Sequence, residues 1–214
     1  MCAMATTNAL SYDDLPNLLT LQTGDEKHSS ASTSTLDVIW TLYDRVLGPD
    51  DRFLLSKGHG PTALYAVLAA KGRIPVEVLP TFGSFESPLG NHPDRVLVPG
   101  VEISSGSLGH GLGIAVGRAL AGARVFCLVG DGELDEGSNW EAVQYAGRVR
   151  LGRLTAIVVD NHSATYNWPG GVEHRFGLEG WTTERVDGRD HDALERALKH
   201  TSAQPHCVVA EIIR

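Results

Sequence analysis

Gly130-Asp131-Gly132 and Asp160-Asn161 decide the fold of this chain, and 28 residues separate Gly132 from Asn161. Each stretch follows a short apolar run rich in valine or isoleucine, residues 123–129 and residues 154–159. Both runs are typical of buried parallel strands, and residues 136–150 between them are typical of a helix. The sequence therefore predicts a strand–helix–strand unit with polar residues at the carboxyl ends of both strands.

The polar residues at these two strand ends predict a binding site. Ligands of open α/β sheets bind in the crevice beyond the carboxyl ends of the strands. Asp131 and Asn161 offer hard oxygens to one cation, and magnesium completes its shell with waters or phosphates. The alternative for each half alone is a tight turn and a helix-capping pair. The spacing across one unit favours a metal–diphosphate site.

Length and composition set the broad class of the protein. A chain of 214 residues with 42% hydrophobic and 21% charged residues is typical of one globular α/β domain. The net charge of −8 and the absence of a basic cluster argue against a nucleic-acid partner. Three scattered cysteines suit a reducing compartment, and no apolar run is long enough to cross a membrane. Without a recognisable signal peptide, a cytoplasmic location is expected.

The remaining pattern predicts a mostly parallel central sheet flanked by helices. Residues 1–27 are expected to be an N-terminal segment that is partly flexible, and residues 28–214 one binding domain. Further strands are expected at 51–56, 181–186 and 207–213, and further helices at 14–22, 36–47, 62–70, 108–120 and 190–200. Residues 82–99 contain repeated glycine and proline and are expected to be a loop.

Two further turns have the composition of ligand-binding segments. Ser56-Lys57-Gly58-His59-Gly60 lies between a strand and a helix that opens at Pro61, which is a geometry that binds anions. Residues 104–109 form a glycine-rich entry to the helix at 108–120. The alternatives are a histidine that only caps its helix and a glycine-rich helix start without a ligand. The turn type favours contact between His59 and a diphosphate.

The segment from Gly130 to Ala142 resembles the transketolase version of the thiamine diphosphate signature, and the resemblance extends over nearly the whole chain from about Ser30. It implies the thiamine diphosphate-binding fold, with thiamine diphosphate and Mg²⁺ (or Ca²⁺) as cofactors. The metal ligands that it implies are Asp131, Asn161 and the main-chain carbonyl of Ser163. The cofactor contacts that it implies are His59, Gly106, Ser107, Leu108, Asp131, Gly132, Glu133 and Asn161.

The resemblance also implies catalytic residues. His28, His59 and His92 are expected to line the donor channel, where imidazoles move protons near neutral pH. Glu136 and Glu141 match carboxylates near a subunit interface. The alternatives are a surface histidine at position 92 and solvated helix carboxylates. The chain departs from the family at His110, where glutamine is usual, around His28, and in residues 162–171.

The chain resembles only one domain of a transketolase, the diphosphate-binding domain. We therefore expect a split enzyme, a transferase subunit that is inactive alone and moves a two-carbon ketol unit from a ketose to an aldehyde. A partner subunit would supply the pyrimidine-binding domain and its activating glutamate, in an α2β2 assembly. In the family a histidine-bearing segment follows the strand that contains Arg214, and its contact is expected to be either missing here or supplied by the partner.

Two alternatives to this function remain open. One is a subunit of another thiamine enzyme, such as the α chain of a 2-oxo acid dehydrogenase or a relative of deoxyxylulose phosphate synthase. The other is a non-catalytic module that binds a partner.

Overall fold

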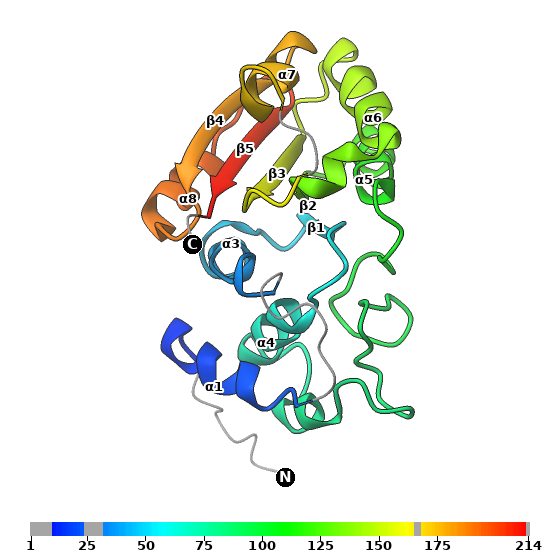
Figure 1. Ribbon diagram of the computed structural model, residues 1–214, viewed down its shortest axis with the longest axis vertical. Coiled ribbons are helices and arrows are strands. Elements are labelled where there is room, and N and C mark those ends of the chain that lie inside the picture. Colours follow the sequence, from blue (N-terminus) through cyan, green and yellow to red (C-terminus); the bar gives the residue numbers. More distant parts are fainter. Residues whose placement is uncertain (1–9, 24–31, 165–167, 213–214) are drawn as a thin grey trace.

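The computed structural model describes residues 10–23, 32–164 and 168–212, and its centre is one five-stranded sheet (Figure 1). The strand order is β1-β2-β3-β5-β4, and every neighbouring pair is parallel. The strands are β1 (Arg52–Leu55), β2 (Val125–Gly130), β3 (Leu154–Asp160), β4 (Thr182–Asp187) and β5 (His206–Glu211). The predicted α/β class with a parallel sheet is confirmed.

The apolar runs become central strands because both faces of the sheet are covered. Every residue of β2 and β3 is buried, as expected for parallel strands packed between two helical layers. In the pairing register Val125 lies opposite Leu154 and Gly130 lies opposite Val159. The residues that follow the two strands therefore emerge side by side at the same edge of the sheet.

Helices cover both faces of the sheet. On one face, the core contains residues of α1, α3, α4 and α8; on the other face, it contains residues of α5, α6 and α7 (Figure 1). The α-helices are α1 (Leu15–Thr20), α3 (Leu36–Thr41), α4 (Thr62–Ala70), α5 (His110–Leu120), α6 (Gly137–Arg148), α7 (Gly171–Leu178) and α8 (His191–Leu198). Short 3-10 or π turns are η1 (Tyr12–Asp14), η2 (Leu42–Val46), η3 (Val76–Thr81) and η4 (Gly132–Asp135).

The differences from the predicted elements have local reasons. The single helix expected at 36–47 is an α-helix to Thr41 and a π-helical turn from Leu42. Helix α7 was not predicted, because only Val172 and Phe176 mark its buried face. Within the N-terminal segment, Leu15 and Leu18 of α1 are buried in the core, and residues 1–9 and 24–31 lie outside the described part.

The loops that follow β1, β2 and β3 leave from the same edge of the sheet, and they place the expected site there. Residues 82–99 contain no helix or strand, as the glycine and proline spacing predicted. Within the parts of the chain that the structure describes, none of the helices has the length and apolar character that a bilayer crossing requires.

Candidate functional site

Asp131 and the loop after β3 are brought together at the carboxyl edge of the sheet. Asp131 is 2% exposed, and its carboxylate accepts hydrogen bonds from the backbone N–H and the hydroxyl of Ser163, each at 2.6 Å. The N–H of Ala164 donates to the same carboxylate at 3.0 Å. A Cβ placed on Gly132 would lie 3.5 Å from the carbonyl oxygen of Ser163. The contact between residues 32 positions apart follows from the register of β2 and β3.

The donor set at this edge fits a hard cation. The amide oxygen Oδ1 of Asn161 is buried and has no hydrogen-bond partner among the described residues. Such an atom is costly to bury unless a ligand satisfies it. This amide oxygen, the carboxylate of Asp131 and the carbonyl of Ser163 are all oxygen donors, the type of ligand that Mg²⁺ or Ca²⁺ prefers. In the described part of the chain no three His, Cys, Asp or Glu side chains cluster as a metal site, and this set does not need them.

The turn after β1 lies against the same edge. Gly130 has no side chain, and a Cβ there would lie 3.2 Å from Cδ of Lys57. Lys57 is 3% exposed, and its ammonium group donates to the hydroxyl of Ser34 at 3.0 Å. Burial lowers the pKa of Lys57, and the nearby charges of Asp131 and Glu133 oppose that shift. Lys57 therefore places a buried amino group beside the turn that follows β2.

Glu133 faces inward, although the sequence places it two residues after Asp131. It is 2% exposed, and its carboxylate accepts hydrogen bonds from the hydroxyl of Ser56 and the N–H groups of Gly109 and Gly130. Burial raises the pKa of the Glu133 carboxyl, and these hydrogen bonds oppose the rise. The carboxylate therefore joins the turn after β1, the start of α5 and the turn after β2.

The glycine-rich loop before α5 packs on the turn after β1 and on His92. A Cβ on Gly58 would lie 2.6 Å from the hydroxyl of Ser105, so only glycine permits this approach. Gly106 has a φ of 130°, and a Cβ there would lie 3.0 Å from the ring of His92. The structure thus brings the predicted residues His92 and Gly106 into contact, with half-buried His59 on the adjoining turn.

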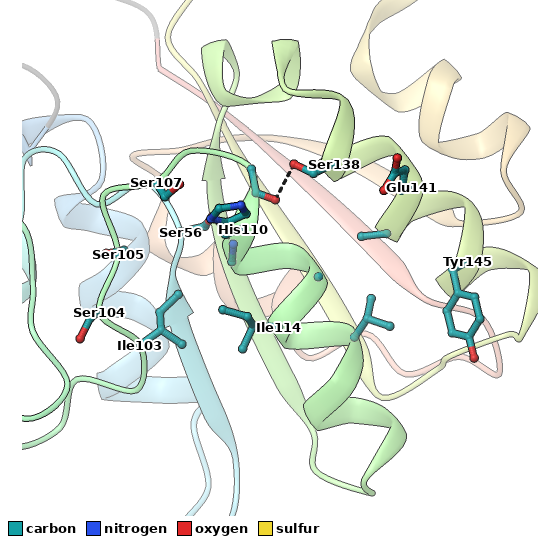
Figure 2. A pocket seen from close by; sticks show the side chains of 15 residues that line it. Ser56, Ile103, Ser104, Ser105, Ser107, His110, Ile114, Ser138, Glu141 and Tyr145 are labelled. Carbon is teal, nitrogen blue, oxygen red and sulfur yellow. Dashed lines mark hydrogen bonds between the residues drawn. The ribbon is translucent and has the colours of Figure 1, made fainter.

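A cavity of about 510 Å³ opens beside this loop, between α5 and α6 (Figure 2). Ser107, His110 and Glu141 line it, with Ile114 and Tyr145 on its walls. The hydroxyl of Ser138 donates to the carbonyl of Gly109 at 3.0 Å across its end. The predicted residue Leu108, within this loop, and Glu136, just before α6, are both exposed.

The prediction for His28 concerns a residue outside the described part of the chain.

Two polar groups at the edge of the sheet were not predicted from the sequence. Arg185 of β4 donates to Asp160 at 3.0 Å and lies 3.2 Å from Glu211, and it lines a cavity of about 290 Å³ with Asp131 and Trp168. The second group is the buried hydroxyl of Ser56. In the sequence, the only sign of the role of Arg185 is a charged residue within a predicted strand. Its contacts could not be predicted, because the sequence does not show that β4 pairs with β5.

Comparisons with known proteins define the class. A family model described as the transketolase, thiamine diphosphate binding domain matches residues 41–125 and 120–210. The protein named "Ferredoxin fas2" from Rhodococcoides fascians is 52% identical over 95% of this chain and 73% of its own length. The 6-deoxy-6-sulfo-D-fructose transketolase subunit SqwG of a Clostridium species is 34% identical over 87% of this chain and 77% of its own length.

The solved transketolase of Leishmania mexicana superposes with a TM-score of 0.78 at 25% identity. The aligned region covers 95% of this chain and 37% of that one. The chain belongs to the transketolase family, and it corresponds to the thiamine diphosphate-binding domain of that family. The resemblance stated from the sequence and the thiamine diphosphate-binding fold are both confirmed.

Proposed function

We propose that this chain is the cofactor-binding subunit of a two-component transketolase, which moves a two-carbon ketol unit from a ketose donor to an aldehyde acceptor. The observation that carries the proposal is the grouping of oxygen donors that follow β2 and β3 at the carboxyl edge of the sheet, namely the buried carboxylate of Asp131, the carbonyl of Ser163 and the unpartnered amide oxygen of Asn161. The family match supports it, as does the Clostridium relative, whose name describes one subunit of a transketolase.

Thiamine diphosphate would supply the nucleophilic carbon and the electron sink of the transfer. Asp131, Asn161 and the carbonyl of Ser163 would hold Mg²⁺, which would bind the diphosphate. A cation at Asp131 competes with the hydrogen bonds that Ser163 and Ala164 now donate. His59 and Gly132 would adjoin the diphosphate, while Gly106, Ser107 and Leu108 would contact the thiamine.

The other proposed roles concern protons. His92 lies against Gly106, which supports a role for its imidazole at the rim of the proposed thiamine position. With His59, and with His28, it would move protons to and from the oxygens of the sugar substrate. Glu136 is exposed at the start of α6 and would act at the interface with a second subunit.

A partner subunit completes this proposal. The chain spans 37% of the Leishmania transketolase, and the partner would contribute the counterpart of the remainder, including the pyrimidine-binding domain with its activating glutamate. The assembly would be α2β2. These assignments rest on the family relationship, and the mass of the purified complex tests them.

Replacement of the metal-binding carboxylate tests the function. In the purified complex, Asp131→Asn should reduce Mg²⁺-dependent affinity for thiamine diphosphate at least roughly 100-fold, because one charged ligand is lost. Isothermal titration measures that affinity, and ketol transfer from a ketose is assayed beside turnover of pyruvate. Asp50→Asn is the matched control, since Asp50 is exposed. Unchanged affinity in Asp131→Asn would remove the metal assignment, and turnover of pyruvate alone would replace the transketolase reaction by that of a 2-oxo acid enzyme.

A further inference from the structure

Glu133 is the buried carboxylate that links three segments of the site. Its Oε1 atom accepts hydrogen bonds from the hydroxyl of Ser56 and from the N–H of Gly109 at 2.9 Å, and Oε2 accepts one from the N–H of Gly130 at 3.3 Å. The backbone carbonyl of Glu133 also accepts a hydrogen bond from Asn139 at 2.7 Å. The residue is therefore held at both its backbone and its side chain.

The hydrogen bonds of Ser56 have a fixed direction. The N–H of Gly111 donates to the Ser56 hydroxyl oxygen at 3.1 Å, so the hydroxyl proton is directed to Glu133. A Cβ on Gly111 would lie 2.3 Å from Cβ of Ser56, which shows how closely α5 approaches the end of β1. Ser56 thus connects the carboxylate of Glu133 to the first turn of α5 through two hydrogen bonds.

These contacts cap the N-terminus of α5 with side chains that are distant in the sequence. The first N–H groups of a helix have no partner within the helix and need acceptors from elsewhere. The N-cap residue of α5, Gly109, has a φ of 84° and no side chain that could cap the helix. Glu133 and Ser56 supply these acceptors from the ends of β2 and β1. The start of α5 is therefore fixed relative to the sheet.

The loop immediately before α5 depends on this fixed point. Its other hydrogen bonds include Arg95 N–H to Ser104 Oγ at 2.9 Å and Ser105 N–H to Pro93 O at 3.3 Å, and both lead to another loop. At Gly109 the loop is hydrogen-bonded to residues that follow β2. The N–H of Gly109 donates to Glu133, and its carbonyl accepts from the hydroxyl of Ser138. A change at Glu133 would therefore be transmitted to residues 104–109.

We propose that Glu133 is a positioning residue, which sets the conformation of residues 104–109 so that this loop fits the thiamine part of the cofactor. The inference rests on the proposed function, because that function places Gly106 and Leu108 against the thiamine. It replaces the expectation that Glu133 itself touches the cofactor. Its carboxylate acts through the N–H of Gly109 and through Ser56.

A role in diphosphate binding is the competing explanation, because Glu133 also bonds Gly130, next to Asp131. Two probes separate the explanations. Thiamine diphosphate contains both parts of the cofactor, whereas inorganic pyrophosphate contains only the part that the metal holds. A residue that positions the loop should affect the first probe and spare the second.

The experiment uses the purified complex, freed of bound cofactor, with saturating Mg²⁺. Glu133→Gln places an NH₂ group where one of the oxygens accepts a hydrogen bond, so at least one bond of the network is lost. We expect affinity for thiamine diphosphate to fall about tenfold or more, and affinity for pyrophosphate to stay within about twofold. Glu77→Gln, at an exposed position outside the site, is the matched control and should change neither affinity.

Ser56→Ala is the second variant, in case Glu133→Gln does not fold. It removes one hydroxyl and leaves Glu133 in place, and we expect a loss of about threefold or more for thiamine diphosphate alone. Equal losses for both probes, or no loss for thiamine diphosphate in either variant, would overturn the positioning role. A wild-type complex that binds neither probe would overturn the proposed function itself, and this inference with it.

Discussion

At the scale of single residues, Gly106 shows how backbone conformation limits the sequence of the site. Its φ of 130° is in a region that residues with a Cβ rarely adopt, and a Cβ would lie 3.0 Å from the ring of His92. We predict that Gly106→Ala lowers the free energy of unfolding by about 1–3 kcal/mol and also weakens thiamine diphosphate binding. Urea denaturation and titration of the complex measure the two effects.

Gly177→Ala is the control for Gly106→Ala. Gly177 lies in α7, and a Cβ there would meet nothing within 4 Å. Alanine is favoured over glycine in helices, so this variant should be as stable as the wild type or slightly more stable. If Gly106→Ala behaves like Gly177→Ala, the strain assigned to position 106 is absent.

His206 makes stability depend on pH. It is 4% exposed at the start of β5, and its Nε2 atom has no hydrogen-bond partner among the described residues. Burial, with a smaller effect of the adjacent His200, lowers the pKa of His206 from 6.5 to about 4. Between these values the unfolded chain binds a proton that the folded chain excludes, so stability falls as pH decreases from 6.5 to 4.

The corresponding variant is His206→Gln, which cannot take up a proton. We predict that wild type loses on the order of 2–3 kcal/mol more than the variant between neutral pH and pH near 4. Urea denaturation at a series of pH values measures this difference. Parallel pH curves for the two proteins would show that His206 is not responsible.

At the scale of elements, Asp37 joins three parts of the chain. It is 3% exposed in α3 and accepts hydrogen bonds from Tyr12 at 2.6 Å and Arg189 at 2.8 Å, with the ring nitrogen Nε2 of His191 at 2.9 Å. Burial and the Asp37 carboxylate raise the pKa of Tyr12 to about 12, so Tyr12 remains a hydrogen-bond donor at neutral pH. The contacts fasten η1 and the start of α8 to α3.

Asp37→Asn removes the charge and leaves one of these donors facing an NH₂ group. We predict a loss of about 1–3 kcal/mol in the free energy of unfolding, because a hydrogen-bond donor at this buried position is left without an acceptor. Chemical denaturation of wild type, Asp37→Asn and the exposed control Asp50→Asn measures this loss. A change below about 0.5 kcal/mol would mean that the three elements are held by apolar packing alone.

At the scale of the whole molecule, activity should require an assembly. The chain aligns with 37% of the Leishmania transketolase, and we propose that a partner subunit holds the far side of the thiamine. We predict that the isolated chain shows no ketol transfer and that adding the partner subunit restores it. Intact-complex mass spectrometry and a transfer assay on the same sample test this, and transfer by the isolated chain would contradict it.

Much of the fold was predictable because it depends on local patterns. The valine-rich runs gave β2 and β3 within about two residues, and the helix expected at 62–70 is α4. Helix α7 could not be predicted, since two apolar residues in eight do not define a helical face. The order of β5 and β4 also depends on long-range pairing, which no local pattern contains.

The sequence by itself determined the family, the parallel sheet and the presence of Asp131 and Asn161 at two strand ends, because motif spacing and hydrophobic periodicity are properties of neighbouring residues. Only the tertiary structure decided that Glu133 faces inward, that Ser56 caps α5 and that Ser163 contacts Asp131. Those contacts join residues 24 to 55 positions apart, and the close packing of strand ends and helix starts creates them.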